Sequence, residues 1–166
     1  VNKTLNLENY KKAILKRFSQ KKFRIKIALD CANGSVFEIA PQFFKEIGCD
    51  VVRYSTTPTG VNINKNCGAM YPKRIARLTK QTRADIGLSF DGDADRVIFS
   101  DEKGNVIDGD LIIGFLANQM LKHNELYGKP VVGTLMSNIG LENFLKEKNI
   151  SFYRTNVGDR YILSKM

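Results

Sequence analysis

Three aspartates stand at alternate positions in the segment Asp91-Gly92-Asp93-Ala94-Asp95-Arg96, directly after an apolar stretch. Carboxylates this close together repel one another and raise one another's pKa, so the arrangement requires a nearby cation. Carboxylate oxygens are hard ligands of the kind that Mg²⁺ and Ca²⁺ prefer. Gly92 allows the chain to turn tightly enough for the side chains to converge. We therefore predict that Asp91, Asp93 and Asp95 bind a divalent metal ion.

Arg96 follows this acidic cluster without a gap. The planar guanidinium group of arginine binds a phosphate through two parallel hydrogen bonds. A metal ion beside it would act on the same anion. Arg96 is therefore the candidate catalytic residue for a reaction at phosphate.

Two other interpretations of the cluster stay open. One is an EF-hand, because Asp91, Asp93, Asp95 and Glu102 match the first, third, fifth and twelfth positions of its loop. It is less favoured because Arg96 replaces the required glycine and because the flanking segments are typical of strands, not helices. The other is a solvated acidic turn that binds no metal.

The chain has one histidine, His123, and three cysteines, Cys31, Cys49 and Cys67. No motif surrounds His123, so nucleophilic catalysis assisted by histidine is not indicated. The cysteines lack C-x-x-C spacing and predict neither a zinc site nor a disulfide framework. Their odd number, the absence of an export-signal pattern and the shortness of every apolar run predict a reduced, cytoplasmic location.

The formal net charge is +9, which on its own would suggest a nucleic-acid partner. Nine of the 26 basic side chains lie in residues 1–26, where Glu8 is the single acid, and residues 27–166 are almost neutral. The favoured interpretation of the leading segment is the solvated face of a helix. An arm that binds anions or nucleic acid is the alternative.

The periodicity of apolar residues predicts helices and strands that alternate along the whole chain. The predicted helices are Leu7–Phe18, Val36–Ile47 (with a cap in the turn Asn33–Ser35), Tyr71–Thr82, Asp110–His123, Gly140–Lys148 and Arg160–Met166. The predicted strands are Arg24–Asp30, Cys49–Tyr54, Ala84–Phe90, Val97–Ser100, Val106–Ile107, Val131–Leu135 and Ser151–Thr155. This alternation predicts an α/β fold of three layers, in which a mixed, mostly parallel sheet has helices on both faces. A break near Asp108–Asp110 predicts a complete module over residues 1–108 and a truncated second α/β module over residues 109–166.

A series of short segments from about Tyr10 onward carries a family pattern. They are Ala28–Gly34, Gly60–Asn64, Cys67-Gly68, Ala84–Gly87, Phe90–Val97, Asp108–Asp110, Val132–Asn138, Gly140–Glu142 and Val157–Tyr161. With these segments the chain resembles the α-D-phosphohexomutases. The segments Asn62-Ile63-Asn64 and Gly133–Asn138 are similar, more narrowly, to members that act on glucosamine phosphates. Met70 and Tyr71 depart from the family, which often has threonine and histidine there.

The resemblance implies a four-domain enzyme, of which residues 1–108 would be the second domain and residues 109–166 the start of the third. The family's serine loop, sugar-selecting loop and final phosphate loop have no counterpart in this sequence, so we expect the isolated chain to be inactive. The implied reaction interconverts glucosamine 6-phosphate and glucosamine 1-phosphate through a phosphoserine and a 1,6-bisphosphate, for UDP-N-acetylglucosamine and cell-wall precursor synthesis. Mg²⁺ bound by the three aspartates is the implied cofactor.

The resemblance also implies that Asp159 and Arg160 lie near the substrate; a surface ion pair at a helix start is the alternative. The implied partner is a hexosamine phosphate, with a homodimer left open and neither nucleic acid nor membrane expected. Two other functions compete with this one. The first is a phosphomannomutase or phosphoglucomutase of the same superfamily, and the second is a non-catalytic anion- or nucleic-acid-binding module that uses the basic leading helix.

Overall fold

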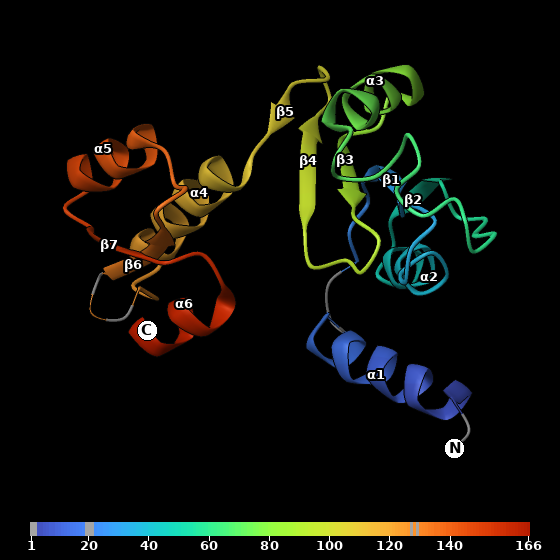
Figure 1. The fold of residues 1–166 in the computed structure, drawn as a ribbon, viewed down its shortest axis with the longest axis horizontal. Helices are drawn as coiled ribbons and strands as arrows, with labels where there is room; N and C mark the ends of the chain where they lie inside the picture. Colours follow the sequence, from blue (N-terminus) through green and yellow to red (C-terminus); the bar gives the residue numbers. More distant parts are fainter. Residues whose placement is uncertain (1–2, 19–21, 127, 129) are drawn as a thin grey trace. The chain divides into compact units, whose positions relative to one another are not determined.

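The computed structural model describes residues 3–18, 22–126, 128 and 130–166, and the chain divides into two compact units, Val1–Ile107 and Asp108–Met166 (Figure 1). Across these described ranges, no helix is long and apolar enough to cross a membrane. Each unit is an α/β assembly with its own apolar core. The predicted fold class, α/β with a mostly parallel sheet flanked by helices, is confirmed.

The first unit contains a five-stranded sheet in the order β2-β1-β3-β4-β5. Its elements are α1 (Lys3–Phe18), β1 (Lys26–Asp30), α2 (Ile39–Glu46), β2 (Asp50–Tyr54), α3 (Pro72–Thr82), β3 (Ile86–Phe90), β4 (Val97–Asp101) and β5 (Val106–Ile107). Strand β1 pairs in parallel with β2 and β3, whereas β4 is antiparallel to both β3 and β5. Strand β4 therefore runs against the other four, as the hairpin in the sequence indicates.

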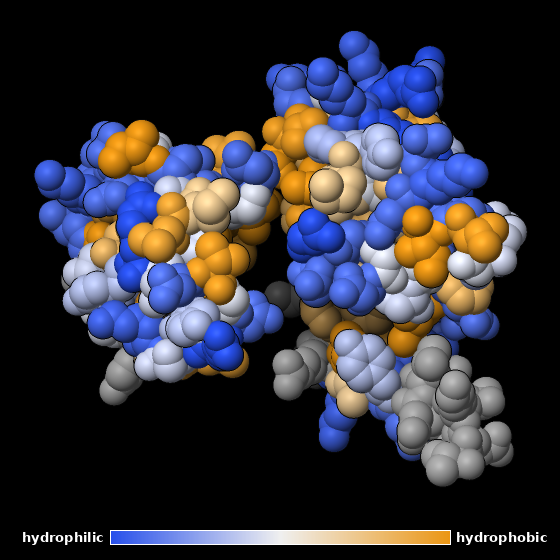
Figure 2. Space-filling view, in the orientation of Figure 1, coloured by the Kyte–Doolittle hydropathy of each residue, from blue (hydrophilic) through white to orange (hydrophobic). Residues whose placement is uncertain are grey.

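The central strand β1 buries side chains on both faces of the sheet, because successive residues of a strand point to opposite sides. Ile27 and Leu29 join the core beneath α2, while Ala28 packs with Ile75 of α3 on the other face. A Cβ atom on Gly87 would lie 2.0 Å from the Thr79 hydroxyl, so only glycine lets α3 approach so closely. The outer face of α3 is hydrophilic (Figure 2).

The second unit consists of α4 (Gly109–Lys122), β6 (Pro130–Thr134), α5 (Ile139–Glu147), β7 (Ser151–Thr155) and α6 (Asp159–Lys165). The two strands are parallel, and Leu141 and Leu145 of α5 form its core with Ala117 of α4. The side chains of Asp108 and Asn138 cap α4 and α5 by accepting hydrogen bonds from backbone N–H groups of the first turn. These caps explain why both helices begin where they do.

Two helix starts differ from the predictions by three residues or more. Helix α2 begins at Ile39, not Val36, and no side chain of the preceding turn caps it. The backbone N–H of Ser35 instead donates to the Gly92 carbonyl at 2.8 Å, so this turn packs against the acidic loop before the helix starts. Helix α1 extends back to Lys3, and Tyr10 of its predicted apolar face is 61% exposed. The predicted Leu7 side chain lies outside the described residues.

The carboxylate of Asp30, at the end of β1, is fully buried and joins four segments. It accepts hydrogen bonds from the backbone N–H groups of Ala32 and Gly68, at 3.0 and 3.2 Å, and it pairs with the Arg74 guanidinium of α3. Arg74 also donates to the Ser55 hydroxyl at 3.2 Å. A buried charge is tolerated only when it is paired and hydrogen-bonded, so this cluster holds the loops at the carboxyl edge of the sheet together.

Replacing Arg74 with methionine should destabilise the chain. The Asp30 carboxylate would stay buried without its cation, which costs about 3–5 kcal/mol for a fully buried pair. Because the Arg74 side chain is 28% exposed, we expect the free energy of unfolding to fall by about 2–3 kcal/mol. Urea unfolding followed by circular dichroism measures this change. Arg77→Met, at an exposed position of the same helix, is the matched control. Equal loss of stability in the two variants would contradict the role of the pair.

Candidate metal centre

The acidic loop of residues 91–96 connects β3 to β4 at the carboxyl end of β1, the edge where α/β sheets bind ligands. The loop closes on itself, because the N–H of Asp91 donates to the Arg96 carbonyl and the N–H of Ala94 donates to the Asp91 carbonyl. Ala94 adopts a left-handed backbone conformation with φ of 65°. This tight closure is what turns side chains from alternate positions toward one centre.

Two other loops pack against the acidic loop at Gly92. A Cβ atom on Gly34 would lie 2.3 Å from the Gly92 carbonyl oxygen, so the two backbones are in direct contact. On the other side, the Asn64 amide and the Ile63 side chain pack against Gly92, where a Cβ atom would lie within 3 Å of both. From the sequence, a helix cap is predicted in the turn Asn33–Ser35, but the contact of Gly34 with Gly92 is not, because only the three-dimensional structure brings the two glycines together.

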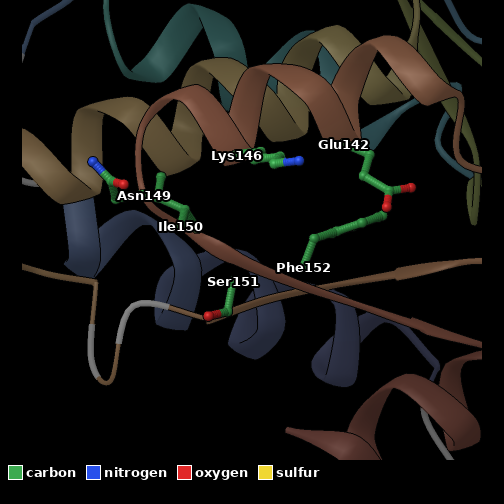
Figure 3. A pocket seen from close by; sticks show the side chains of 6 residues that line it. All are labelled: Glu142, Lys146, Asn149, Ile150, Ser151 and Phe152. Atoms are coloured by element: carbon green, nitrogen blue, oxygen red, sulfur yellow. The ribbon is translucent and has the colours of Figure 1, made fainter.

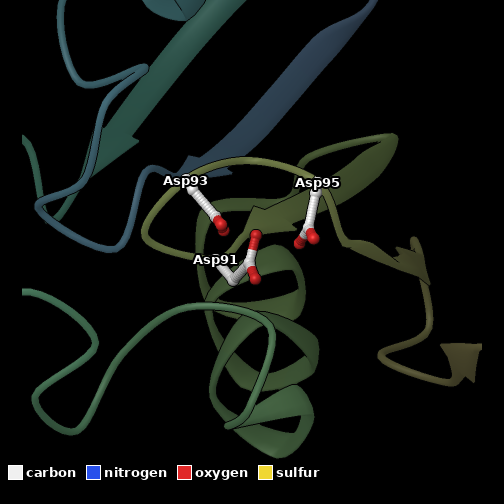
Figure 4. Close-up of side chains that lie close together, drawn as sticks. All are labelled: Asp91, Asp93 and Asp95. Carbon is white, nitrogen blue, oxygen red and sulfur yellow. The ribbon is translucent and has the colours of Figure 1, made fainter. Parts of the chain in front are cut away.

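The three aspartates converge as predicted (Figure 4). One oxygen from each of Asp91, Asp93 and Asp95 lies within 4.8 Å of the others. Asp91 is 1% exposed, whereas Asp93 and Asp95 are open to solvent. A donor set of hard carboxylate oxygens, one of them buried, fits a Mg²⁺-like cation that keeps some of its water.

Asp91 and Asp95 share a hydrogen bond, and their pKa values shift in opposite directions. Burial alone would raise the pKa of Asp91, but hydrogen bonds from the Arg96 backbone and side chain, together with one from Asp95, lower it overall. The hydrogen bond to Asp91, loss of solvation and the negative charges of Asp93 and Asp91 raise the pKa of Asp95. The opposite shifts mean that, as the pH falls, Asp95 takes up a proton before Asp91 does.

Arg96 lies across the outer side of the cluster. Its Nε atom donates to Asp91 Oδ2 at 2.8 Å and lies 3.5 Å from Asp95 Oδ1, and the bond to Asp91 raises the pKa of Arg96. Its Nη1 atom donates to the Met70 sulfur at 3.3 Å. The side chain is 60% exposed, and its guanidinium group is held through Nε and Nη1. The sequence marks Met70 only as a departure from a family pattern and gives no sign of its contact with Arg96.

The flanks of the loop do not support an EF-hand. Strands β3 and β4 enter and leave the loop, where an EF-hand has helices. Glu102, the matching twelfth position, lies in the exposed turn after β4. The EF-hand interpretation is therefore wrong.

Cys31, beside this edge, is not a nucleophile at neutral pH. Burial and the neighbouring Asp30 charge raise the pKa of its thiol to about 12. Since the thiolate is the reactive form, this group stays protonated and inert. Cys31, Cys49 and Cys67 are all buried and free.

Asp159 and Arg160 begin α6 in the second unit. The Arg160 guanidinium stacks on the Tyr161 ring, with 4.6 Å to the ring centroid, and donates to the Tyr161 hydroxyl at 2.7 Å. No salt bridge joins Asp159 to Arg160, both of which the structure describes, so the surface ion pair does not form. Their position near a substrate stays a prediction.

A hollow of about 420 Å³ in the second unit lies between α5 and β7 (Figure 3). Its lining consists of Glu142, Lys146, Asn149, Ile150, Ser151 and Phe152. Glu142 is already paired with Arg154, whose guanidinium also donates to the Ser137 carbonyl at 2.6 Å. The pair of Glu142 and Arg154 thus stabilises the local structure. None of the residues that line the hollow was predicted to bind a ligand.

Comparisons with known proteins agree with these two units. Residues 7–104 match the family model described as "Phosphoglucomutase/phosphomannomutase, alpha/beta/alpha domain II", and residues 108–166 match the corresponding model of domain III. Phosphoglucosamine mutase from Dictyoglomus thermophilum is 47% identical over 166 residues, which cover 99% of this chain and 36% of that protein. The enzyme of the same name from Phenylobacterium zucineum is 48% identical over 142 residues, which cover 86% of this chain and 32% of that one.

Solved structures show the same fold. A phosphoglucomutase/phosphomannomutase family protein from Burkholderia thailandensis has a TM-score of 0.80 at 24% identity, covering 96% of this chain and 35% of its own. An N-acetylphosphoglucosamine mutase from Aspergillus fumigatus, in complex with glucose 1,6-bisphosphate, has a TM-score of 0.69 at 23% identity, with coverages of 95% and 33%. The chain spans about a third of the length of the curated relatives. By these matches, the chain belongs to the phosphoglucomutase/phosphomannomutase family, the α-D-phosphohexomutases, and is homologous to its domains II and III.

Proposed function

We propose that this chain provides the metal-binding segment of a phosphoglucosamine mutase, which interconverts glucosamine 6-phosphate and glucosamine 1-phosphate. The observation that carries the proposal is the convergence of Asp91, Asp93 and Asp95 beside Arg96. The identity of 47% to phosphoglucosamine mutase supports this sugar over mannose or glucose phosphates. We propose Mg²⁺ as the metal, because the donors are carboxylates alone and the site is open to water on one side.

Transfer of a phosphoryl group depends on positioning and on neutralising charge, and it requires little covalent chemistry from side chains. When bound, Mg²⁺ supplies a Lewis acid for a phosphoryl oxygen. Asp91 and its two exposed neighbours hold the ion at the carboxyl edge of the sheet. Arg96 has its Nη2 group available, which binds another oxygen of the same phosphoryl group and stabilises the charge that spreads over it during transfer.

The phosphate itself would be carried by a serine, through a 1,6-bisphosphate intermediate. The glucose 1,6-bisphosphate in the complex of the Aspergillus fumigatus enzyme is a ligand of this type. The serine pattern expected for this role does not occur in the 166 residues. We assign Asp159 and Arg160 to positioning of the substrate, and we place the reaction in the cytoplasm, where buried free thiols such as Cys31 persist.

The metal assignment predicts the effect of Asp93→Asn. Removal of one ligand charge should weaken Mg²⁺ binding to the 166-residue chain by at least about tenfold, equivalent to 1.4 kcal/mol, in calorimetric titration. Glu102→Gln removes an equal charge from the turn after β4, outside the cluster, and should leave the titration unchanged. If Asp93→Asn titrated like the parent chain, the loop would not be the metal site.

A chimera tests the reaction. Residues 1–166 replace the matching segment of the Dictyoglomus thermophilum enzyme, and interconversion of glucosamine 6-phosphate and glucosamine 1-phosphate is measured. We expect the chimera to be active and the isolated chain to be inactive. In the chimera, Asp93→Asn should lower kcat by about 100-fold or more, which is roughly 2.7 kcal/mol in activation free energy.

Three outcomes would contradict the proposal. They are an inactive chimera that is folded, an active Asp93→Asn chimera, and activity of the isolated 166 residues. A chimera that prefers mannose or glucose phosphates would favour the alternative mutases of the superfamily.

A further inference from the structure

We infer that Met70 is a positioning residue for Arg96: its thioether accepts from Nη1 while Asp91 accepts from Nε, so that Nη2 is left to meet the phosphoryl oxygen. This inference rests on the proposed function for the identity of that anion. The contact itself does not depend on it. Met70 would act through Arg96 and would not touch the substrate.

Two of the three nitrogens of the Arg96 guanidinium group donate to different acceptors. Nε donates to Asp91 Oδ2 at 2.8 Å, and Nη1 donates to the Met70 sulfur at 3.3 Å. Among the described residues, none accepts a hydrogen bond from Nη2. With the side chain 60% exposed, the Nη2 amino group has donors available for an anion.

The chemistry of the sulfur suits this role. A divalent cation and Arg96 both interact with the carboxylates of Asp91 and Asp95. A bound cation therefore weakens the hydrogen bond and the ion pairing between those carboxylates and the arginine. A thioether is a soft, weak acceptor that does not compete for a hard ion such as Mg²⁺. The Met70 contact is therefore the restraint on Arg96 that metal binding leaves in place.

The backbone at Met70 is anchored to the same edge of the sheet. The N–H of Ala69 donates to the Phe90 carbonyl at 2.9 Å, one residue before Asp91. The N–H of Gly68 donates to the buried Asp30 carboxylate, and Gly68 adopts a φ of +80°, which favours glycine. Met70 itself is 61% exposed, so burial in a core does not explain why its side chain lies across Arg96.

The first test uses NMR of the arginine side chains in the 166-residue chain, without substrate. We expect Met70→Leu, which keeps the volume and removes the acceptor, to speed rotation of the Arg96 guanidinium group about Nε–Cζ by about threefold or more. Met120→Leu, in α4, should leave the rate unchanged. Met70→Gln restores an acceptor on an unbranched side chain and should return the rate toward that of the parent chain.

An unchanged rate in Met70→Leu would overturn the inference. Rotation in Met70→Gln as fast as in Met70→Leu would also overturn it, because restoring a hydrogen-bond acceptor would then have no effect. Should Met70→Leu fail to fold, the comparison of Met70→Gln with the parent chain decides: a slow rate supports the inference and a fast rate overturns it.

The second test uses the chimera. Met70→Leu should lower kcat about fivefold or more, while KM and Mg²⁺ affinity change less than about twofold, because the arginine contact strengthens in the transition state. A rise in KM with unchanged kcat would overturn the role. If the parent chimera is inactive, the proposed function fails, and the NMR experiment still decides the role of Met70.

Discussion

The carboxyl edge of the first unit depends on one buried charge. Asp30 ends the central strand with its carboxylate fully excluded from water, and such a group is tolerated only with a cation and hydrogen bonds in place. The groups that satisfy it come from Ala32, Gly68 and Arg74, which belong to the loop after β1, the loop before α3 and α3 itself. Satisfying Asp30 therefore gathers the segments that surround the candidate metal centre, although Asp30 contributes no ligand.

The acidic loop is positioned by these neighbours rather than by its own residues alone. The segment after Asp30 places Gly34 against Gly92, with backbone contact too close for any side chain. The segment held by Gly68 carries Met70 to Arg96. Two loops anchored on the same buried carboxylate thus contact the acidic loop from two sides, which explains how solvent-exposed aspartates can keep a fixed arrangement.

Features that depend on residues close together in the chain can be predicted from the sequence. Alternate aspartates after a strand identify the cluster, and apolar periodicity identifies nearly every helix and strand, because both depend on residues close together in the chain. Contacts across the chain leave no such signal. Nothing near Gly34 indicates that it meets Gly92, so the start of α2 was predicted three residues early. Met70 contacts a side chain 26 residues away, and its type alone suggested only a departure from a family pattern.

The charge balance of the loop links its structure to its chemistry. Three carboxylates and one guanidinium group leave a formal charge of −2. The hydrogen bond to Asp91, loss of solvation and the neighbouring negative charges together raise the pKa of Asp95. One divalent ion would cancel the formal charge without any further protein group. In the proposed function, a phosphoryl group would then meet a neutral loop in which Nη2 of Arg96 has donors left. Because Met70 carries no charge, its contact with Nη1 orients the arginine without adding negative charge beside those donors.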